Sequence, residues 1–284
     1  MTCVKATVHG AVSIVNAIAT GKGAALGISK KVDVEIETSH GKGVIIETKN
    51  KQISSRLISK TIEKIIPKKE LSQIKLKVIL DSDIPTGFGL KSSSAISSAV
   101  ALGCAKLFKP DMSDFEILRS GVDASIETKV SLTGAYDDAC ACYYGGFNVT
   151  DNYKKKIIRY EKCLDDVSAM IFIPKSRKRG NYLKLKTLKD VFEQAWNLAK
   201  NSDYWNAMII NGIATSSILN SDPKIISKLI ENGALGASVS GNGPSIAAIT
   251  KKQTLPDIKN VFSLLDGSTT VHQINNKKAE VHEL

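Results

Sequence analysis

IPTGFGLKSSSAISSAVALG, residues 84–103, is the most informative stretch of this 284-residue chain. It begins as a loop in which Gly87 and Gly89 let the backbone turn tightly and approach a ligand closely. It continues as a helix that begins at the serines 92–94, whose hydroxyls and free backbone N–H groups point the same way. The helix dipole adds partial positive charge there, so we predict an anion site that suits a nucleotide phosphate.

A glycine-rich turn with a serine cap is the simpler interpretation of the same residues. The familiar nucleotide motifs do not decide between the two, because neither of them fits. The motif G-x-x-x-x-G-K-[ST] is absent, since Leu90 precedes Lys91 and Ser92. The motif G-x-G-x-x-G fails because Ser92 stands where the third glycine is required.

Strands and helices are mixed on both sides of this stretch. Apolar residues alternate over residues 32–36, and after a glycine-containing turn residues 44–47 predict a second strand that forms a hairpin with the first. The charged residues 154–166 are predicted to cross the surface between two halves. The remaining patterns predict strands at 74–80, 147–149, 167–174, 236–239, 245–250 and 268–273, and helices at 54–66, 92–108, 188–201 and 204–220, with Ser113 capping one more helix.

This order of elements predicts an α+β fold rather than a doubly wound parallel sheet. We expect two subdomains, one formed by residues 1–160 and the other by residues 161–284.

Composition narrows the class of protein. The chain is 43% apolar and 24% charged, so it has enough apolar surface for a core and is not mainly disordered. No run approaches the ~18 apolar residues of a membrane span, and we see no secretory signal. Five cysteines form an odd number in a large chain, which disfavours a disulfide framework and fits a cytoplasmic protein.

Basic residues outnumber acidic ones by 39 to 28, for a net charge of +11. This charge suits either nucleic acid or a small anionic ligand. The lysines are scattered in twos and threes, and aromatic residues are only 6% of the chain and do not alternate with them. A platform for stacking bases is weakly supported, so we expect a small-molecule substrate and neither a nucleic acid nor a membrane as partner.

Two adjacent carboxylates, Asp137 and Asp138, lie in the otherwise small and apolar segment TGAYDDACACYYGG, residues 133–146. Two neighbouring carboxylates are costly to bury unless a cation or a functional partner is near. Either of them is suited to accept a proton from a substrate hydroxyl, and a helix cap is the alternative role for the other.

The stretch at 84–103 resembles the central motif of the GHMP kinases, P-x-x-x-G-L-G-S-S-A. Lys91 stands where that family usually has glycine, and Ser94 where it has alanine. Near the C-terminus, GASVSGNGPSIAAI, residues 236–249, resembles the family's third motif, and residues 133–146 resemble the segment with its catalytic aspartate. The matching residues of the first and third motifs are Pro85, Gly89, Leu90, Ser92, Ser93, Ser240, Gly241, Gly243, Pro244 and Ser245.

Within this family, the blocks NAIATGKG, GLKSSSA, TGAYDDA and YYGG are similar to those of the archaeal shikimate kinases. His9 occupies the place of a lysine or arginine in other members. The resemblance implies a two-subdomain GHMP kinase fold with the ATP site between the halves. It also implies ATP-dependent phosphorylation of the shikimate 3-hydroxyl, in the route to chorismate and aromatic amino acids. A kinase of another small alcohol, of the homoserine or mevalonate type, is the alternative.

The resemblance also implies residue roles. Asp138 is the preferred catalytic aspartate because six residues separate it from Gly145-Gly146, and Asp137 is the alternative. Ser93 and Glu127 are the implied ligands of Mg²⁺. ATP is expected to contact Pro85, Thr86, Gly87, Phe88, Gly89, Leu90, Lys91, Ser92, Ser93, Ser94 and Ala95, and the substrate to contact Asn16, Lys22, Ser240, Gly241 and Gly243.

The run of basic residues after the strand at 167–174 has two interpretations. Arginine side chains there have the forked donors that suit a carboxylate. A solvated basic loop explains them equally well. The residues are Lys175, Arg177, Lys178 and Arg179.

Overall fold

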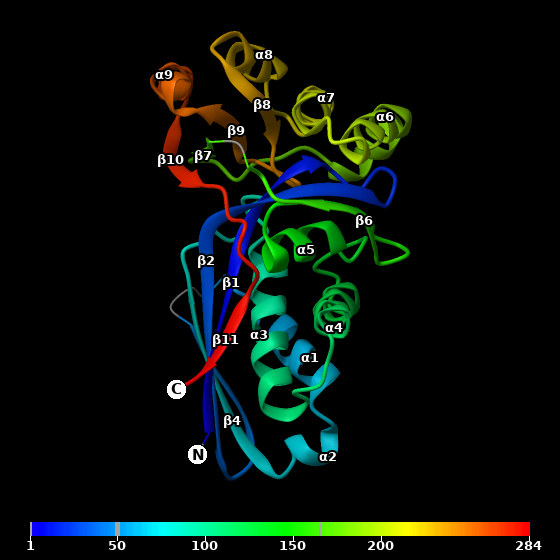
Figure 1. Ribbon diagram of the computed structural model, residues 1–284, viewed down its shortest axis with the longest axis vertical. Coiled ribbons are helices and arrows are strands. Elements are labelled where there is room, and N and C mark those ends of the chain that lie inside the picture. The colour runs from blue at the N-terminus through cyan, green and yellow to red at the C-terminus, as the bar shows by residue number, and fades with distance from the viewer. Residues whose placement is uncertain (1, 49–51, 165) are drawn as a thin grey trace.

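A computed structural model describes residues 2–48, 52–164 and 166–284. These residues form two β-sheets, each covered by helices, and the two halves are stacked along the long axis in Figure 1. One sheet has seven strands, with the order β11-β1-β2-β4-β3 and with β5 and β6 branching from β2. The other has four strands in the order β10-β7-β9-β8. The mixed architecture confirms the predicted α+β class.

The larger sheet is built on two long antiparallel strands, β1 (Thr2–Val15) and β2 (Lys22–His40). On the other side of β2 lies β4 (Ile74–Ser82), which is antiparallel to it. The edge strand is β3 (Gly43–Thr48), which runs parallel to β4.

The predicted hairpin between residues 32–36 and 44–47 is therefore wrong, because β4 lies between those two strands. The cause is burial. Leu76, Val78 and Leu80 of β4 are almost completely buried, so β4 takes the inner position. Strand β3 only alternates between exposed and partly buried residues, which suits an edge.

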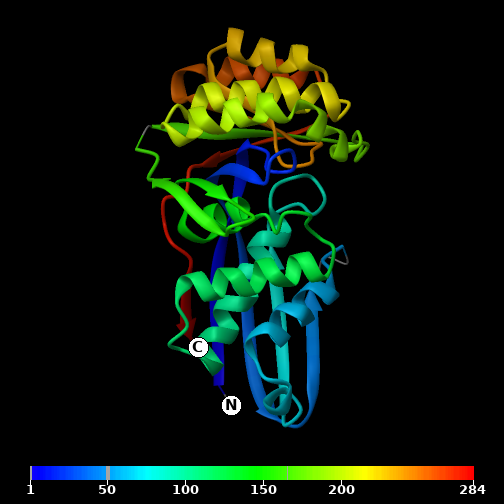
Figure 2. The same ribbon diagram turned by 90° about the vertical axis from the view of Figure 1, so that its right-hand side faces the viewer.

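Helices cover one face of this sheet, as Figure 2 shows. The central helix is the one predicted at residues 92–108, and its small side chains are buried over most of its length. The helix that Ser113 was predicted to cap has a full capping box with Glu116. The helices of this half are α1 (Ser55–Ile65), α2 (Lys68–Leu71), α3 (Ser92–Phe108), α4 (Asp114–Glu127) and α5 (Tyr136–Tyr144).

The segment between the halves is more regular than predicted. Strand β5 (Phe147–Asp151) turns back into β6 (Lys156–Glu161), and the two pair antiparallel beside β2. The prediction that residues 154–166 form a plain surface crossing is wrong over β6, because this charged strand finds a partner in β5. Residue 165 lies outside the described residues.

The second half places its helices on the outer face of the four-stranded sheet, above it in Figure 1. The predicted strand at 167–174 is β7 with the same bounds. The pattern had not indicated α8 or α9. The elements are β7 (Val167–Pro174), η1 (Tyr182–Leu188), α6 (Lys189–Lys200), α7 (Tyr204–Ile218), α8 (Pro223–Glu231), β8 (Ala234–Val239), β9 (Ile246–Lys251), η2 (Lys252–Thr254), α9 (Leu255–Ser263) and β10 (Gly267–Gln273).

The last strand, β11 (Glu280–Glu283), leaves the second half and pairs with β1 at the edge of the larger sheet. Both ends of the chain thus lie close together in Figure 1. The division into residues 1–160 and 161–284 stays a prediction. None of the helices in the described residues is long and apolar enough to span a membrane.

Candidate active site

A cavity of about 210 Å³ lies where the two halves meet, and the start of α3 forms one end of it. Lys91 is the N-cap residue of α3 and makes no capping bond with its side chain. The N–H groups of the first turn are therefore not taken by a cap, and the three serines that follow Lys91 line the cavity. Hydroxyls, N–H groups and the positive end of the helix dipole together suit a phosphate.

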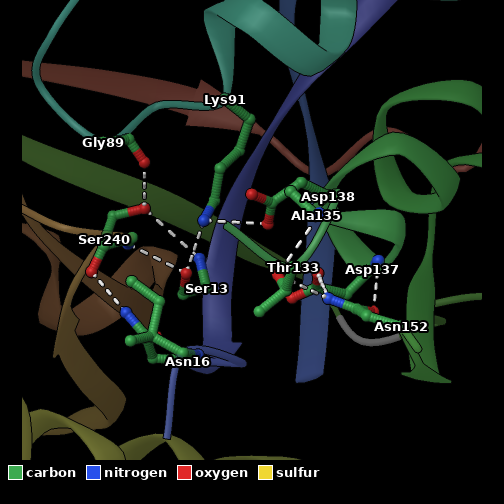
Figure 3. A network of polar contacts seen from close by, with 12 residues as sticks. Ser13, Asn16, Gly89, Lys91, Thr133, Ala135, Asp137, Asp138, Asn152 and Ser240 are labelled. Carbon is green, nitrogen blue, oxygen red and sulfur yellow. Dashed lines mark hydrogen bonds and ion pairs between the residues drawn. The ribbon is translucent and has the colours of Figure 1, made fainter. Parts of the chain in front are cut away.

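The two glycine-rich loops touch each other beside this helix start. Ser240 Oγ donates to the Gly89 carbonyl oxygen at 2.8 Å, as Figure 3 shows. Gly89 has a φ of +81°, and a Cβ at this position would overlap the Ser240 carbonyl oxygen. Only glycine fits such a close approach of two backbones. Gly241 lies on the same seam, where its N–H donates to Ser13 Oγ at 2.9 Å.

Lys91 connects the phosphate end of the cavity to the aspartates. Its Nζ lies 2.9 Å from Asp138 Oδ1 and 2.6 Å from Ser13 Oγ. The lysine and aspartate side chains are only 5% and 15% exposed. Lys91 has a φ of +65°, which is uncommon for a residue with a side chain, and its ammonium group lies between Ser13 and Asp138 (Figure 3). The departure from glycine at this position therefore supplies a buried cation.

The two adjacent aspartates of α5 have different surroundings. Asp138 faces Lys91, whereas Asp137 Oδ1 accepts a hydrogen bond of 2.7 Å from Asn152 Nδ2. The backbone N–H of Asp137 donates in return to Asn152 Oδ1 at 3.1 Å. Burial, followed by the negative charge of Asp138, raises the pKa of Asp137 from an ordinary 3.8 to about 7. Gly23 is required opposite, because a Cβ there would overlap Asp137 Oδ2.

Asn16 lies on the turn after β1 and lines the cavity. Its Nδ2 donates to the Gly241 carbonyl oxygen at 2.7 Å, and its N–H donates to Asn211 Oδ1 at 2.8 Å. Arg179 and Tyr182 reach the same cavity from the second half. The complete lining is Ser13, Asn16, Ala17, Ile18, Gly87, Gly89, Lys91, Ser92, Ser93, Ser94, Ser125, Lys129, Val130, Ser131, Leu132, Thr133, Ala135, Asp137, Asp138, Arg179, Tyr182, Gly241 and Asn242.

Several residues predicted to contact ATP or substrate do not line the cavity. Leu90 and Ala95 are buried in the core instead. The ring of Phe88 lies 4.9 Å from the Arg177 guanidinium, outside the lining. The others outside it are Pro85, Thr86, Ser240 and Gly243, of which Ser240 supports the wall through its hydrogen bonds.

Lys22 does not reach the cavity, contrary to its predicted role in binding substrate. Its ammonium group pairs with Glu193 of α6 and lies 4.8 Å from the centroid of the Trp196 ring. Lys22 is the first residue of β2, and α6 covers that end of the strand. The structure therefore places it in a contact between the two halves.

Glu127 is likewise kept away from Ser93. It is the last residue of α4, and its carboxylate pairs with Lys64 and, at 3.3 Å, with Lys60 of α1. These ion pairs lower the pKa of Glu127. The geometry does not support Glu127 as a metal ligand, because its charge is already matched by two lysines outside the cavity lining.

Sequence reasoning missed several residues of the cavity lining, among them Ser13, Lys129 and Tyr182. Ser13 carried a usable signal, since it is a hydroxyl within the apolar strand segment AVSIV and must find a buried partner. Lys129 and Tyr182 carried none, because each comes just after or at the start of a helical element whose tertiary position is set elsewhere.

Family models and curated sequences both match this chain. The model of the GHMP kinases N terminal domain matches residues 56–146, and that of the GHMP kinases C terminal domain matches residues 221–263. The shikimate kinase of Methanothermobacter thermautotrophicus is 32% identical over 100% of both chains. The shikimate kinase of Methanosarcina acetivorans is 35% identical over 96% of this chain and 95% of its own.

Solved structures share the fold at lower identity. The mevalonate kinase of Methanococcus jannaschii superposes with a TM-score of 0.76 at 16% identity, covering 96% of this chain and 98% of its own. The homoserine kinase of Cytophaga hutchinsonii gives a TM-score of 0.75 at 18% identity, covering 99% and 97%. The fold is thus shared by kinases whose names give different acceptors.

Proposed function

The chain belongs to the GHMP kinase family of ATP-dependent small-molecule kinases, and we propose that its acceptor is the 3-hydroxyl of shikimate. The observation that carries this proposal is the likeness to curated shikimate kinases over nearly the whole chain. The likeness in fold to mevalonate and homoserine kinases does not choose among acceptors, because it is shared by all of them.

Asp138 is our candidate for the group that removes the proton of the acceptor hydroxyl. It lines the cavity, and Lys91 balances its negative charge at 2.9 Å. As the acceptor oxygen bonds to the γ-phosphorus, its proton passes to the Asp138 carboxylate and the bond from phosphorus to the ADP oxygen breaks. Asp137 is less suited to this role, because Asn152 holds it and its raised pKa keeps it partly protonated near neutral pH.

The serines at the start of α3 are our candidates for holding the phosphates of ATP. Mg²⁺ prefers oxygen ligands and usually keeps phosphates and waters in its shell. No cluster of three or more His, Cys, Asp and Glu side chains occurs in the part of the chain that the structure describes. The Ser93 hydroxyl and the phosphate oxygens of ATP are the donors that suit the ion at this site. Mg²⁺ bound there would neutralise phosphate charge.

We place the reaction in the cytoplasm, in the route to chorismate and the aromatic amino acids. The cysteines support a reducing compartment, because those in the described residues form no disulfide. A basic surface with a net charge of +11 also favours the approach of two anionic substrates.

An assay of ADP formation tests the proposal. The purified chain is incubated with ATP and Mg²⁺ and with shikimate, homoserine, mevalonate or galactose in turn. We expect only shikimate to stimulate ADP formation. Turnover of homoserine or mevalonate with none for shikimate overturns the proposed acceptor while leaving the kinase activity in place.

A further inference from the structure

Each of the four basic residues after β7 has different neighbours in the structure. Lys175 pairs with Asp266 at 2.6 Å. Arg177 donates to Gln52 Oε1 at 2.6 Å and lies over the Phe88 ring. Lys178 lines a second cavity, between β7 and α8, and only Arg179 lines the cavity that contains the two aspartates. The structure thus separates one residue from a run that the sequence left undivided.

The backbone on both sides of Arg179 is anchored, so the fold fixes where this segment lies. The N–H of Lys175 donates to the Asp266 carbonyl oxygen at 3.2 Å. The N–H of Gly180 donates to the Leu219 carbonyl oxygen at 3.0 Å, and a Cβ on Gly180 would overlap the Ile218 carbonyl oxygen. The Arg179 guanidinium lies 5.8 Å from the centroid of the Tyr182 ring, which lines the same cavity.

Among the described residues, the cations that line the cavity are Lys91, Lys129 and Arg179, and their surroundings differ. Lys91 is already paired with Asp138. Lys129 follows α4, which packs against α3 and hence lies on the phosphate side. Arg179 comes from the opposite half, and among the described residues no carboxylate forms an ion pair with it.

An acid that enters this cavity brings a carboxylate that neither acidic group of α5 can pair with, and Lys91 is already paired with Asp138. A cation from the second half would supply the partner that this carboxylate needs. A guanidinium has paired donors that match a carboxylate in a bidentate geometry. Arg179 is the residue of the second half that provides this group in the cavity lining.

We propose that Arg179 binds the carboxylate of the acceptor and makes the enzyme select a hydroxy acid. This inference rests on the proposed function, since it assumes an acceptor with a carboxylate. Arg179 would orient such an acceptor across the cavity, with the carboxylate toward the second half and the hydroxyl toward Asp138.

The experiment compares shikimate with its methyl ester, which keeps the hydroxyls and loses the charge. We expect wild-type protein to prefer the acid strongly. Arg179→Met should raise KM for shikimate by about 10- to 100-fold, the scale of a lost charged hydrogen bond, and should remove most of the preference over the ester. Arg179→Lys should keep an intermediate preference, because it keeps the charge but not the forked donors.

Two further variants serve as references. Lys178→Met removes a neighbouring cation that faces the second cavity, and it should leave both KM values unchanged. Lys129→Met should raise KM for ATP rather than for shikimate. Thermal melts establish that each variant is folded.

The inference is overturned if Arg179→Met raises KM for ATP instead, or if the preference for acid over ester persists in that variant. The wild-type acceptor assay reads the proposed function separately. If homoserine or mevalonate proves to be the acceptor, the same acid-to-ester comparison is made with that acid, and the assignment of Arg179 stands or falls on it. Turnover of galactose alone overturns both proposals.

Discussion

The cavity wall formed by β1, the start of α3 and α5 keeps its charged groups buried and paired with one another, whereas the wall formed by Arg179 and Tyr182 presents one exposed arginine. On the first wall, Lys91, Ser13 and Asp138 form one connected group. On the second, Arg179 has only the ring of Tyr182 beside it in the contacts described above. Fixed, buried charges need little rearrangement during a reaction, while an exposed arginine is free to bind a ligand. Substitutions on the first wall should therefore lower kcat, and those on the second should raise KM.

The largest effect is expected at Asp138. Asp138→Asn keeps the size of the side chain and removes its charge and its basic oxygen. We expect kcat to fall by ~10²-fold or more, the scale of losing a general base. Nucleotide affinity, measured by equilibrium binding of ATP, should change little, since we propose that the start of α3 and not Asp138 holds the phosphates. A larger loss in Asp137→Asn than in Asp138→Asn would move the base to Asp137.

The next largest effect is expected at Lys91. Lys91→Gly removes the cation beside Asp138, and glycine adopts the residue's φ of +65° without strain. We expect kcat to fall by about 10- to 100-fold, as when one fixed electrostatic partner of the reacting group is lost. Ethylammonium added to the assay should restore part of the activity by filling the vacated space. Full activity without the added amine would show that the first wall does not depend on this charge.

The sequence predicted elements whose signal is local. The apolar run at residues 167–174 and the small-residue helix at 92–108 have the predicted bounds, because spacing along the chain is enough to define them. The partner of a strand depends on residues far away in the chain, which is why the predicted pairing of β3 with β2 was wrong. Helix α8 did carry a signal, since Asp222 caps it and Pro223 begins it, and the pattern was overlooked.

The same distinction holds within the site. The glycine and serine loop and the paired aspartates were identifiable because their residue types are unusual in a row, although their roles stay predictions. The ion pair between Lys91 and Asp138 was not, since 46 residues separate them in the chain. Glu127 was predicted to be a metal ligand from its position in the sequence. Its neighbours along the chain give no sign that Lys60 and Lys64 of α1 form ion pairs with its carboxylate.

A smaller effect than at Asp138 or Lys91 is expected at Ser93, one of the serines that we propose to hold the phosphates. Ser93→Ala removes one hydroxyl from the start of α3 and changes the volume little. We expect about a tenfold loss of kcat, together with a higher Mg²⁺ concentration at half-maximal rate. Glu127→Gln is the matched comparison and should stay within about twofold in both measurements, because its carboxylate is paired outside the cavity lining. Equal responses in the two variants would contradict the roles given to both residues.

The smallest effect on turnover is expected at Asp137, whose contribution should appear in stability instead. Its pKa is raised from 3.8 to about 7 by burial and by the charge of Asp138, so the folded chain holds this proton more tightly than the unfolded chain does. The unfolded chain therefore binds fewer protons than the folded chain between about pH 4 and pH 7, and the free energy of unfolding falls over that range as the pH rises.

Asp137→Asn removes this pH dependence and keeps an oxygen that accepts from Asn152 Nδ2. Its Tm should come closest to that of wild type at the acid end of this range, near pH 4, and exceed it by a few degrees at pH 8, while kcat falls by less than about tenfold. The exposed Asp111→Asn is the control, with a Tm difference that does not change with pH. Parallel Tm curves for Asp137→Asn and wild type would show that ionisation of Asp137 does not destabilise the fold. The contrast between the two aspartates would then rest only on the ion pair of Asp138 with Lys91.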